Sequence, residues 1–196
     1  MKSFWLFISG AVCGAAVSAV LPRITTHLHE AAAHTLDGVQ APTDAARAHT
    51  EEKFAFTVHA PMKEVALLFG AKKERGWSPH WDPHFIYPLP AADTEGMVFT
   101  VKHGRRSSIW INTDFDVKNG RIQYAYIIPD TMTTVITVRL KSEDSLTNAE
   151  VQYDRTALTA EAETLVRQLA EQDRRAGPFW EAQMNGYLER RKGSTS

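Results

Sequence analysis

The sequence predicts an α+β domain in which a curved antiparallel sheet wraps around a long C-terminal helix. Two periodic patterns lead to this prediction. Between residues 54 and 158, apolar residues recur in short runs with the alternation of half-buried strands. From Thr159 to Leu188 the apolar spacing becomes helical, which would give a helix about 45 Å long. A series of strands followed by one long helix is typical of α+β proteins.

The domain is expected to begin with a strand at residues 54–58 and a short helix after Pro61. Val65, Leu68 and Phe69 follow Pro61 at helical spacing, and proline suits the first helical turn. Six further strands are predicted at residues 85–89, 97–102, 108–117, 122–128, 133–140 and 148–158. A connection rich in Trp, Pro and His precedes the first of these.

The predicted strand at residues 108–117 carries two candidate faces. One face holds Ile109, Ile111, Phe115 and Val117, and we expect it to face the core. Asp114 and Asp116 share the other face, where they are expected to be solvated rather than to act as paired acid–base groups. Asn119-Gly120 then predicts a two-residue hairpin turn with positive φ at both positions.

The C-terminal helix is expected to begin at Thr159, which is a good N-cap residue. Glu161 and Glu163 follow it, where acidic side chains favour the positive end of the helix dipole. Gly177-Pro178 should kink or split the helix, because Pro178 has no N–H and its ring crowds the preceding turn.

The composition excludes several classes of function. The chain has 196 residues, 43% of them apolar, and a formal net charge of −1, so it offers no basic face for nucleic acid. Its single cysteine, Cys13, lies outside the expected domain. The domain therefore has no disulfide, no thiolate nucleophile and no cysteine-based zinc site.

The first 22 residues form a hydrophobic leader. Residues 4–21 carry no charge, Lys2 precedes them, and Pro22-Arg23 ends the run. The run suits either a signal peptide cleaved after Ala19 or a single-span membrane anchor. Both alternatives place the domain in the periplasm, either secreted or facing it from the membrane.

Residues 23–51 are assigned to a linker and residues 52–193 to the folded domain. The linker contains His27, His29 and His34. We do not assign them a metal site. His29 and His34 are five residues apart and would not share a helical face, and zinc requires three or four converging ligands.

The domain resembles the START-like superfamily, also called SRPBCC or polyketide cyclase-like. The matching positions are Phe54-x-Phe56-Thr57-Val58, Ala60-Pro61-x-x-x-Val65, Phe69, Glu74-Arg75-x-Trp77-x-Pro79-x-Trp81-Asp82-Pro83, Gly96-Met97-Val98-Phe99, Trp110, Asp116, Ile122-x-Tyr124, Val138-x-Leu140, Tyr153-x-x-Thr156-Ala157-Leu158, Trp180 and Tyr187-Leu188. The string from Glu74 to Pro83 is the most distinctive, and it resembles a bacterial subgroup with no settled activity.

This resemblance implies a helix-grip fold with an apolar cavity between the sheet and the long helix. Members of the superfamily bind lipids, sterols, polyketides, hormones or quinones, and some are cyclases or hydrolases. The break at Pro178 departs from the smooth C-terminal helix that the resemblance implies.

The candidate cavity residues are aromatic or lie in the Trp-rich loop. They are Trp77, His80, Trp81, Trp110, Tyr124, Tyr126, Tyr153, Phe179 and Trp180. The loop could gate a cavity, could bind a metal through His80, Asp82 and His84, or could simply pack its indoles on the core. The strand aromatics could line a ligand cavity or serve only as strand-forming residues.

We therefore expect a binding module for a lipid-like or other apolar small molecule. The alternatives are a cyclase- or hydrolase-type enzyme using the same cavity and an envelope module that binds a protein partner. No catalytic, phosphate-binding or dinucleotide-binding motif is present. We assign no catalytic residue, no metal and no cofactor.

Overall fold

A computed structural model describes residues 46–194 of the chain. Its elements, in order, are β1 (His49–Val58), α1 (Met62–Leu68), α2 (Ala71–Glu74), β2 (Pro83–Tyr87), β3 (Val98–His103), β4 (Arg106–Asp116), β5 (Arg121–Ile128), β6 (Met132–Glu143), β7 (Leu146–Ala157), α3 (Glu163–Asp173) and α4 (Gly177–Gly193). The hydrophobic leader, Cys13 and the linker histidines lie outside the described residues. β1 begins at His49, three residues before the expected start of the domain.

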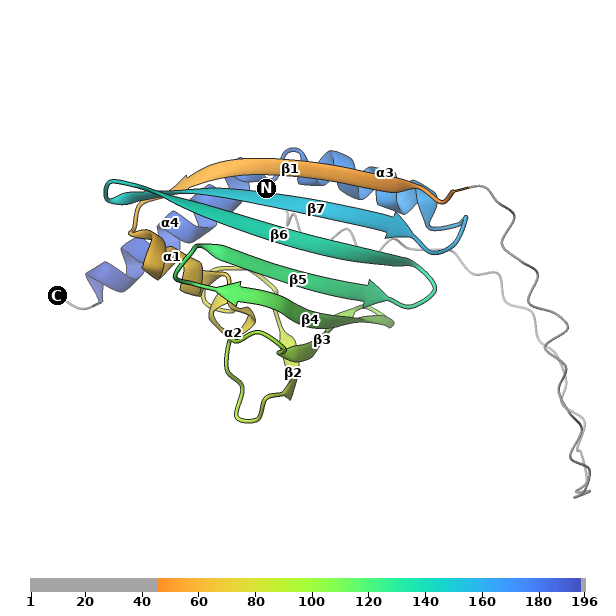
Figure 1. Cartoon of the computed structure of the whole chain (residues 1–196), viewed down its shortest axis with the longest axis horizontal. Coiled ribbons are helices and arrows are strands. Elements are labelled where there is room, and N and C mark those ends of the chain that lie inside the picture. Colours follow the sequence, from red (N-terminus) through yellow and green to blue (C-terminus); the bar gives the residue numbers. More distant parts are fainter. Residues whose placement is uncertain (1–45, 195–196) are drawn as a thin grey trace, which may run out of the picture. The chain divides into compact units, whose positions relative to one another are not determined.

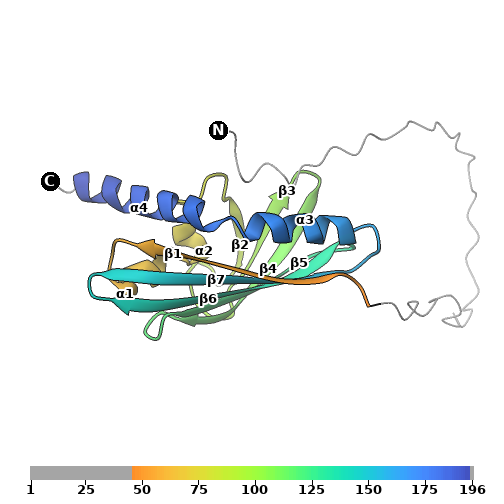
Figure 2. The same ribbon diagram turned by 90° about the horizontal axis from the view of Figure 1, so that it is seen from above.

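The strands form one antiparallel sheet in the order β1-β7-β6-β5-β4-β3-β2 (Figure 1). α3 and α4 run one after the other across a single face of this sheet (Figure 2). The side chains between this face and the helices make the core, which includes Phe54 on β1, Tyr153 on β7 and Trp180 on α4. The predicted α+β architecture, with a curved sheet against C-terminal helices, is confirmed.

β4 presents its faces differently from the prediction. Ile109 and Ile111 lie on the outer face, where they are 44% and 41% exposed, and Trp110 and Asn112 point into the core. The register with β5 shifts between Asn112 and Asp114, so an extra residue in β4 reverses the alternation there. Phe115 therefore packs against the core as expected. The prediction was wrong for Ile109 and Ile111, because it extended one alternation of faces through the whole strand and the alternating sequence pattern does not reveal the bulge.

The β4–β5 hairpin is present, but its turn spans residues 117–120 rather than two residues. Only Gly120 adopts a positive φ, of 66°. Asp116 stabilises the turn by accepting a hydrogen bond from the Asn119 backbone N–H at 3.1 Å. Arg121 contacts both Asp114 and Asp116 at 3.3 Å, so these carboxylates belong to a surface ion-pair cluster.

The C-terminal helix is split, as Gly177-Pro178 predicted. α3 ends at Asp173 and α4 starts at Gly177, with Pro178 in its first turn. The backbone also comes too close to β1 for any side chain at Gly177, because a Cβ there would lie 2.9 Å from the Ala55 carbonyl oxygen. The predicted cap at Thr159 was wrong: residues 159–162 form turns, and α3 begins at Glu163.

α4 covers the free edge of β1 with polar side chains. Glu181 accepts a hydrogen bond from the Thr57 N–H at 3.0 Å. Asn185 accepts from the His59 N–H at 2.8 Å and donates to the Thr57 carbonyl at 3.0 Å. These side chains stand in for a neighbouring strand at the C-terminal end of β1, so this part of the edge is paired rather than open.

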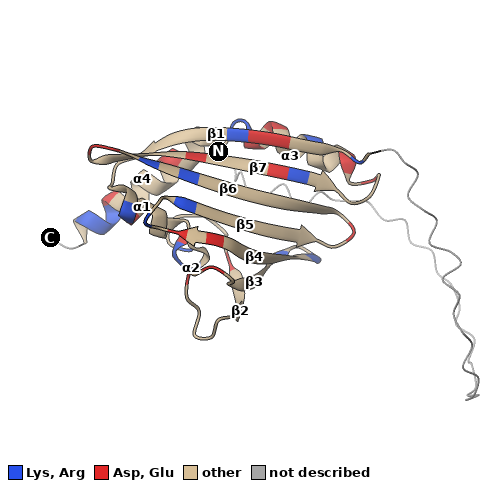
Figure 3. Cartoon of the chain, viewed as in Figure 1, with Lys and Arg blue, Asp and Glu red and all other residues tan. Residues whose placement is uncertain are grey.

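The outer face of the sheet is uncharged along the middle of β5 and β6 (Figure 3). Ile127 on β5, 43% exposed, lies opposite Ile109 on β4 there. Among residues 46–194, none of the helices combines the length and the apolar character needed to cross a membrane.

Candidate functional site

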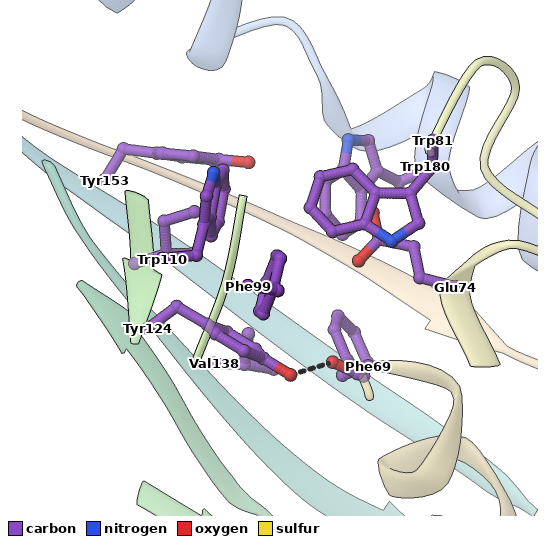
Figure 4. A pocket seen from close by; sticks show the side chains of 10 residues that line it. Phe69, Glu74, Trp81, Phe99, Trp110, Tyr124, Val138, Tyr153 and Trp180 are labelled. Carbon is purple, nitrogen blue, oxygen red and sulfur yellow. Dashed lines mark hydrogen bonds between the residues drawn. The ribbon is translucent and has the colours of Figure 1, made fainter. Parts of the chain in front are cut away.

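A small pocket lies in the core between the sheet and the helices. It is lined by Phe69, Glu74, Trp81, Phe99, Trp110, Tyr124, Ile136, Val138, Tyr153 and Trp180. Seven of these ten side chains are aromatic and two are aliphatic, so Glu74 is the one carboxyl group among them. The close-up shows the carboxyl group and the aromatic side chains converging on one space (Figure 4).

Five of the nine predicted cavity residues line this pocket: Trp81, Trp110, Tyr124, Tyr153 and Trp180. Two others support the wall from behind, since Trp77 packs against Trp180 at 5.2 Å and Tyr126 stacks on Trp110 at 4.2 Å between ring centroids. Phe179 is half-buried and packs at the side of the core. His80 is exposed and lies away from the pocket in a left-handed turn, with φ 65°.

The junction between α1 and α2 is held by three side-chain donors. The ends of short helices leave carbonyl groups without intrahelical partners. Here the Trp77 indole donates to the Leu68 carbonyl at 2.7 Å, and the Tyr124 hydroxyl donates to the Phe69 carbonyl at 3.0 Å. The Trp81 indole donates to the Ala71 carbonyl at 2.8 Å. These bonds tie the end of α1 to β5 and to the Trp-rich loop, and tie α2, which carries Glu74, to the same loop.

The strand side of the pocket is a stack of aromatic rings. Phe99 and Trp110 lie face to face at 5.5 Å, and Tyr124 meets both rings edge-on at 6.1 Å. The Trp110 indole donates to the Ser108 hydroxyl at 2.6 Å, and this hydroxyl also lies 2.8 Å from a ring nitrogen of His103. Burial lowers the pKa of His103. This wall is therefore fixed by both packing and hydrogen bonds.

The helix side of the pocket is formed by Trp180 on α4. Its ring contacts Phe54 at 5.6 Å and Phe69 at 6.1 Å, in addition to Trp77. Trp180 therefore joins α4 to β1 and to the C-terminal end of α1.

Glu74 is the functional candidate that sequence reasoning missed. It closes the four-residue helix α2 and places a carboxyl group beside aromatic side chains. Burial raises its pKa to about 8, the nearby Asp93 carboxylate adds to the rise, and the Ser78 hydroxyl opposes it. At neutral pH this group is therefore mostly protonated, unlike an ordinary surface glutamate.

Tyr153 supplies a second polar group to the pocket. Its hydroxyl points into the space between the rings (Figure 4). Burial raises its pKa well above the ordinary value, so the phenol is neutral. Together with Glu74 it can hydrogen-bond a bound molecule.

The cavity enclosed by these side chains is about 30 Å³. By the usual measure this is room for about two water molecules. Pockets for drug-sized ligands are an order of magnitude larger, roughly 300–1,000 Å³. The aromatic side chains therefore fill most of the space that the fold leaves between sheet and helices.

A buried ion pair lies beside the pocket. Arg155 on β7 is 5% exposed and makes a two-pronged contact with Asp173 at the end of α3, at 2.8 and 3.0 Å. It also donates to the Tyr126 hydroxyl and lies over the Tyr153 ring at 4.4 Å. Its donors are committed to protein partners, so the pair anchors α3 to the sheet.

The candidate metal ligands of the Trp-rich loop do not converge. Asp82 is bound to Arg75 at 3.1 Å, and His80 and His84 are exposed. Within residues 46–194, no three His, Cys, Asp or Glu side chains are grouped to hold a metal ion.

No protein-family model matches the chain, and no curated protein matches it in sequence. Solved structures do match it in fold. Norcoclaurine synthase from Thalictrum flavum aligns with a TM-score of 0.55 and 11% identity over 87% of this chain and 97% of that one. A protein from Thermobifida fusca aligns with a TM-score of 0.51 and 17% identity over 71% of this chain and 95% of that one.

A third structure, DynU16 from the dynemicin biosynthetic locus, aligns at a TM-score of 0.47 and 16% identity. The alignment covers 71% of this chain, which spans 47% of the length of DynU16. Identities this low are informative about the fold and not about the activity. With its sheet order and C-terminal helices, the chain has the helix-grip fold of START-like proteins.

Proposed function

We propose that the domain binds a small apolar molecule in the pocket around Glu74. The observation that carries this proposal is the lining, in which nine of ten side chains are aromatic or aliphatic and one is an acid. Small-molecule sites combine apolar walls with a few polar groups that orient the ligand. Glu74 and the Tyr153 hydroxyl are those groups here.

A ligand of more than a few atoms must displace part of the aromatic filling. Phe99, Trp110, Tyr124 and Tyr153 lie on central strands and are held by the sheet on both sides. Trp81 and Trp180 lie on the loop and on α4, which pack against the sheet rather than belonging to it. The proposal therefore places ligand entry at these two indoles, which would move outward together with their elements.

Native mass spectrometry of the full chain tests this proposal. The protein would be produced in a bacterial host and purified without detergent, in nanodiscs if the leader is retained. The expected result is an added mass that disappears on denaturation and is identified by extraction as an apolar compound. A mass equal to that of the bare chain, with no change of tryptophan emission on adding apolar compounds, would contradict it.

Glu74 also supports a second candidate, an enzyme that uses this carboxyl as a general acid or base. A pKa near the working pH is what proton transfer requires, and burial provides it here. Incubating the captured compound with the protein and with Glu74→Gln separates the two functions. An enzyme would convert the compound and the variant would not, whereas a binding protein would return it unchanged.

A further inference from the structure

Glu74 is a half-buried residue whose carboxyl group faces the pocket and has no cationic partner among the described residues. No Lys, Arg or His within residues 46–194 lies in ion-pair contact with it. Two of the three basic residues next to it in sequence are engaged elsewhere, since Lys72 donates to the Ala91 carbonyl at 3.2 Å and Arg75 binds Asp82 at 3.1 Å. An unpaired buried carboxylate is costly, so this group needs either a proton or a positive charge from outside.

Three neighbouring donors of the pocket are committed to other partners, whereas the Ser78 hydroxyl, which lowers the pKa of Glu74, and the Tyr153 hydroxyl remain as neutral donors. The Tyr124 hydroxyl and the Trp81 indole N–H both bond to backbone carbonyls, and the Trp110 indole bonds to Ser108. They are not available to satisfy an ionised Glu74. The remaining lining is made largely of aromatic rings, whose faces attract cations. Trp110 is stacked on Phe99 and on Tyr126, so the indoles of Trp81 and Trp180 are the candidates for this contact.

We propose that the pocket recognises a molecule with a protonated amino group on an apolar body, with the ammonium bound between Glu74 and the indoles of Trp81 and Trp180. This inference deepens the proposed function and rests on it. The carboxylate would supply the opposite charge, the indole faces would supply cation–π attraction, and the apolar body would occupy the aliphatic side near Ile136 and Val138.

Binding of an ammonium should release a proton. In the unliganded protein the Glu74 carboxyl is protonated at pH 7, because burial raises its pKa to about 8. A cation beside it favours the ionised form, so the carboxyl proton leaves to the solvent while the amino group keeps its own. About 0.9 proton per bound molecule is expected at pH 7, falling towards zero above about pH 9.

The other titratable groups around Glu74 are Asp93 from the β2–β3 loop, Tyr124 from β5 and Tyr153 from β7. Burial raises the pKa of both tyrosines, so they stay neutral in this range. The pKa of Asp93 is raised by burial and held back by the backbone N–H groups of Lys72 and Lys73. The released proton is therefore assigned by comparison with a variant.

The test is titration calorimetry of the full chain with benzylamine and with benzyl alcohol, its neutral isostere. Each titration is run at pH 7 in two buffers of different ionisation enthalpy, which gives the number of protons released. We expect benzylamine to bind at least about tenfold more tightly than benzyl alcohol and to release close to one proton. Glu74→Gln should remove both the preference and the release, and Glu95→Gln, at an exposed site, should keep them.

The outcomes separate this inference from the proposed function. Equal affinities without proton release would overturn the amine preference and leave apolar binding in place. If the neutral ketone acetophenone bound more tightly than benzylamine, protonated Glu74 would be acting as a hydrogen-bond donor. This result would also overturn the amine preference. Binding of neither probe up to about 10 mM would overturn both. Proton release and the preference between the two probes are both measured on the unaltered chain, and Glu74→Gln is needed only to assign the released proton to Glu74.

Discussion

Individual residues in this core owe their properties to their surroundings rather than to their type. Glu74 and Glu95 are the same residue, yet one lies among aromatic rings and the other is exposed. Burial raises the pKa of Glu74 from its ordinary value of 4.5 to about 8. The acid that defines the site is therefore recognisable only once its surroundings are known.

Glu74 should make the stability of the protein fall with rising pH. The folded state keeps the Glu74 proton up to about pH 8, whereas the unfolded chain loses it near 4.5, so the unfolded state binds fewer protons in this interval. By linkage, the free energy of unfolding should fall by on the order of 3 kcal/mol between about pH 5 and pH 8. Urea denaturation across this range should show a flatter profile for Glu74→Gln, and the unaltered slope for Glu95→Gln. Parallel profiles for the unaltered chain and Glu74→Gln would contradict the assignment.

Asn112 is a second residue whose setting is unusual. It is fully buried on β4, and neither its amide nitrogen nor its amide oxygen has a hydrogen-bond partner in the described part of the chain. Leaving such a group unsatisfied costs stability. Asn112→Leu, which has a similar volume, should therefore raise the free energy of unfolding by about 1 kcal/mol in urea denaturation. A loss of stability would show that the amide is satisfied, by the neighbouring Tyr124 hydroxyl or by ordered water.

At the scale of elements, the C-terminal helices are attached to the sheet by polar contacts as well as by apolar packing. α4 pairs with the edge of β1 through Glu181 and Asn185. Arg174, at the end of α3, binds Glu52 of β1 at 3.0 Å, and Arg155 binds Asp173 in the core. The break between α3 and α4 lies between these anchors, so each helix has its own attachment to the sheet.

Removing Asp173 should destabilise the protein much more than removing a surface acid of the same helix. Asp173→Ala leaves the Arg155 guanidinium buried without a counter-charge, which costs about 3 kcal/mol or more. Glu171→Ala, which removes an exposed partner of Arg174, should cost less than about 1 kcal/mol. Thermal and urea denaturation of both variants provide the comparison.

The double variant Arg155→Met with Asp173→Leu checks the cause. It removes both charges at once, so it should be more stable than Asp173→Ala. If it is equally unstable, packing around α3 rather than the unpaired charge accounts for the loss.

At the scale of the whole molecule, the sheet and the two helices enclose a pocket whose walls differ in rigidity. The strand wall is tied into a seven-stranded sheet, and the opposite wall consists of the short helices α1 and α2, the Trp-rich loop and α4. The cavity left in this core is only about 30 Å³. Under the proposed function, the helix-and-loop wall would move outward to accept a ligand while the strand wall stays in place.

The cellular location of the domain remains a proposal that rests on residues 1–22. The uncharged run at residues 4–21 should carry the domain out of the cytoplasm in a bacterial host. A reporter that folds only outside the cytoplasm, fused after residue 46, should be active, and removal of residues 1–22 should abolish that activity. Carbonate extraction then distinguishes an anchor, which stays with the membrane, from a cleaved signal peptide. Reporter activity without residues 1–22 would contradict the proposal.

Much of the fold could be predicted because periodicity is a local property. Alternating residues in β1 and β7, the Asn119-Gly120 turn and the Gly177-Pro178 break each depend on neighbours along the chain. The turn length and the start of α3 were wrong, since both depend on backbone contacts around them. Five pocket residues, three of them on strands, were found because large aromatic residues tend to be buried.

The sequence by itself determined the order of the strands, the aromatic character of the core and the resemblance to START-like proteins, but not the short helix α2 that carries Glu74. Only the tertiary structure decided that a bulge turns Ile109 and Ile111 outward, that the aromatic side chains nearly fill the cavity, and that Glu74 faces it. The reason is physical. Hydrophobic periodicity acts over a few residues, whereas the position of Glu74 is set by indole and phenol groups from a loop and from β5, which meet α2 only in the folded chain.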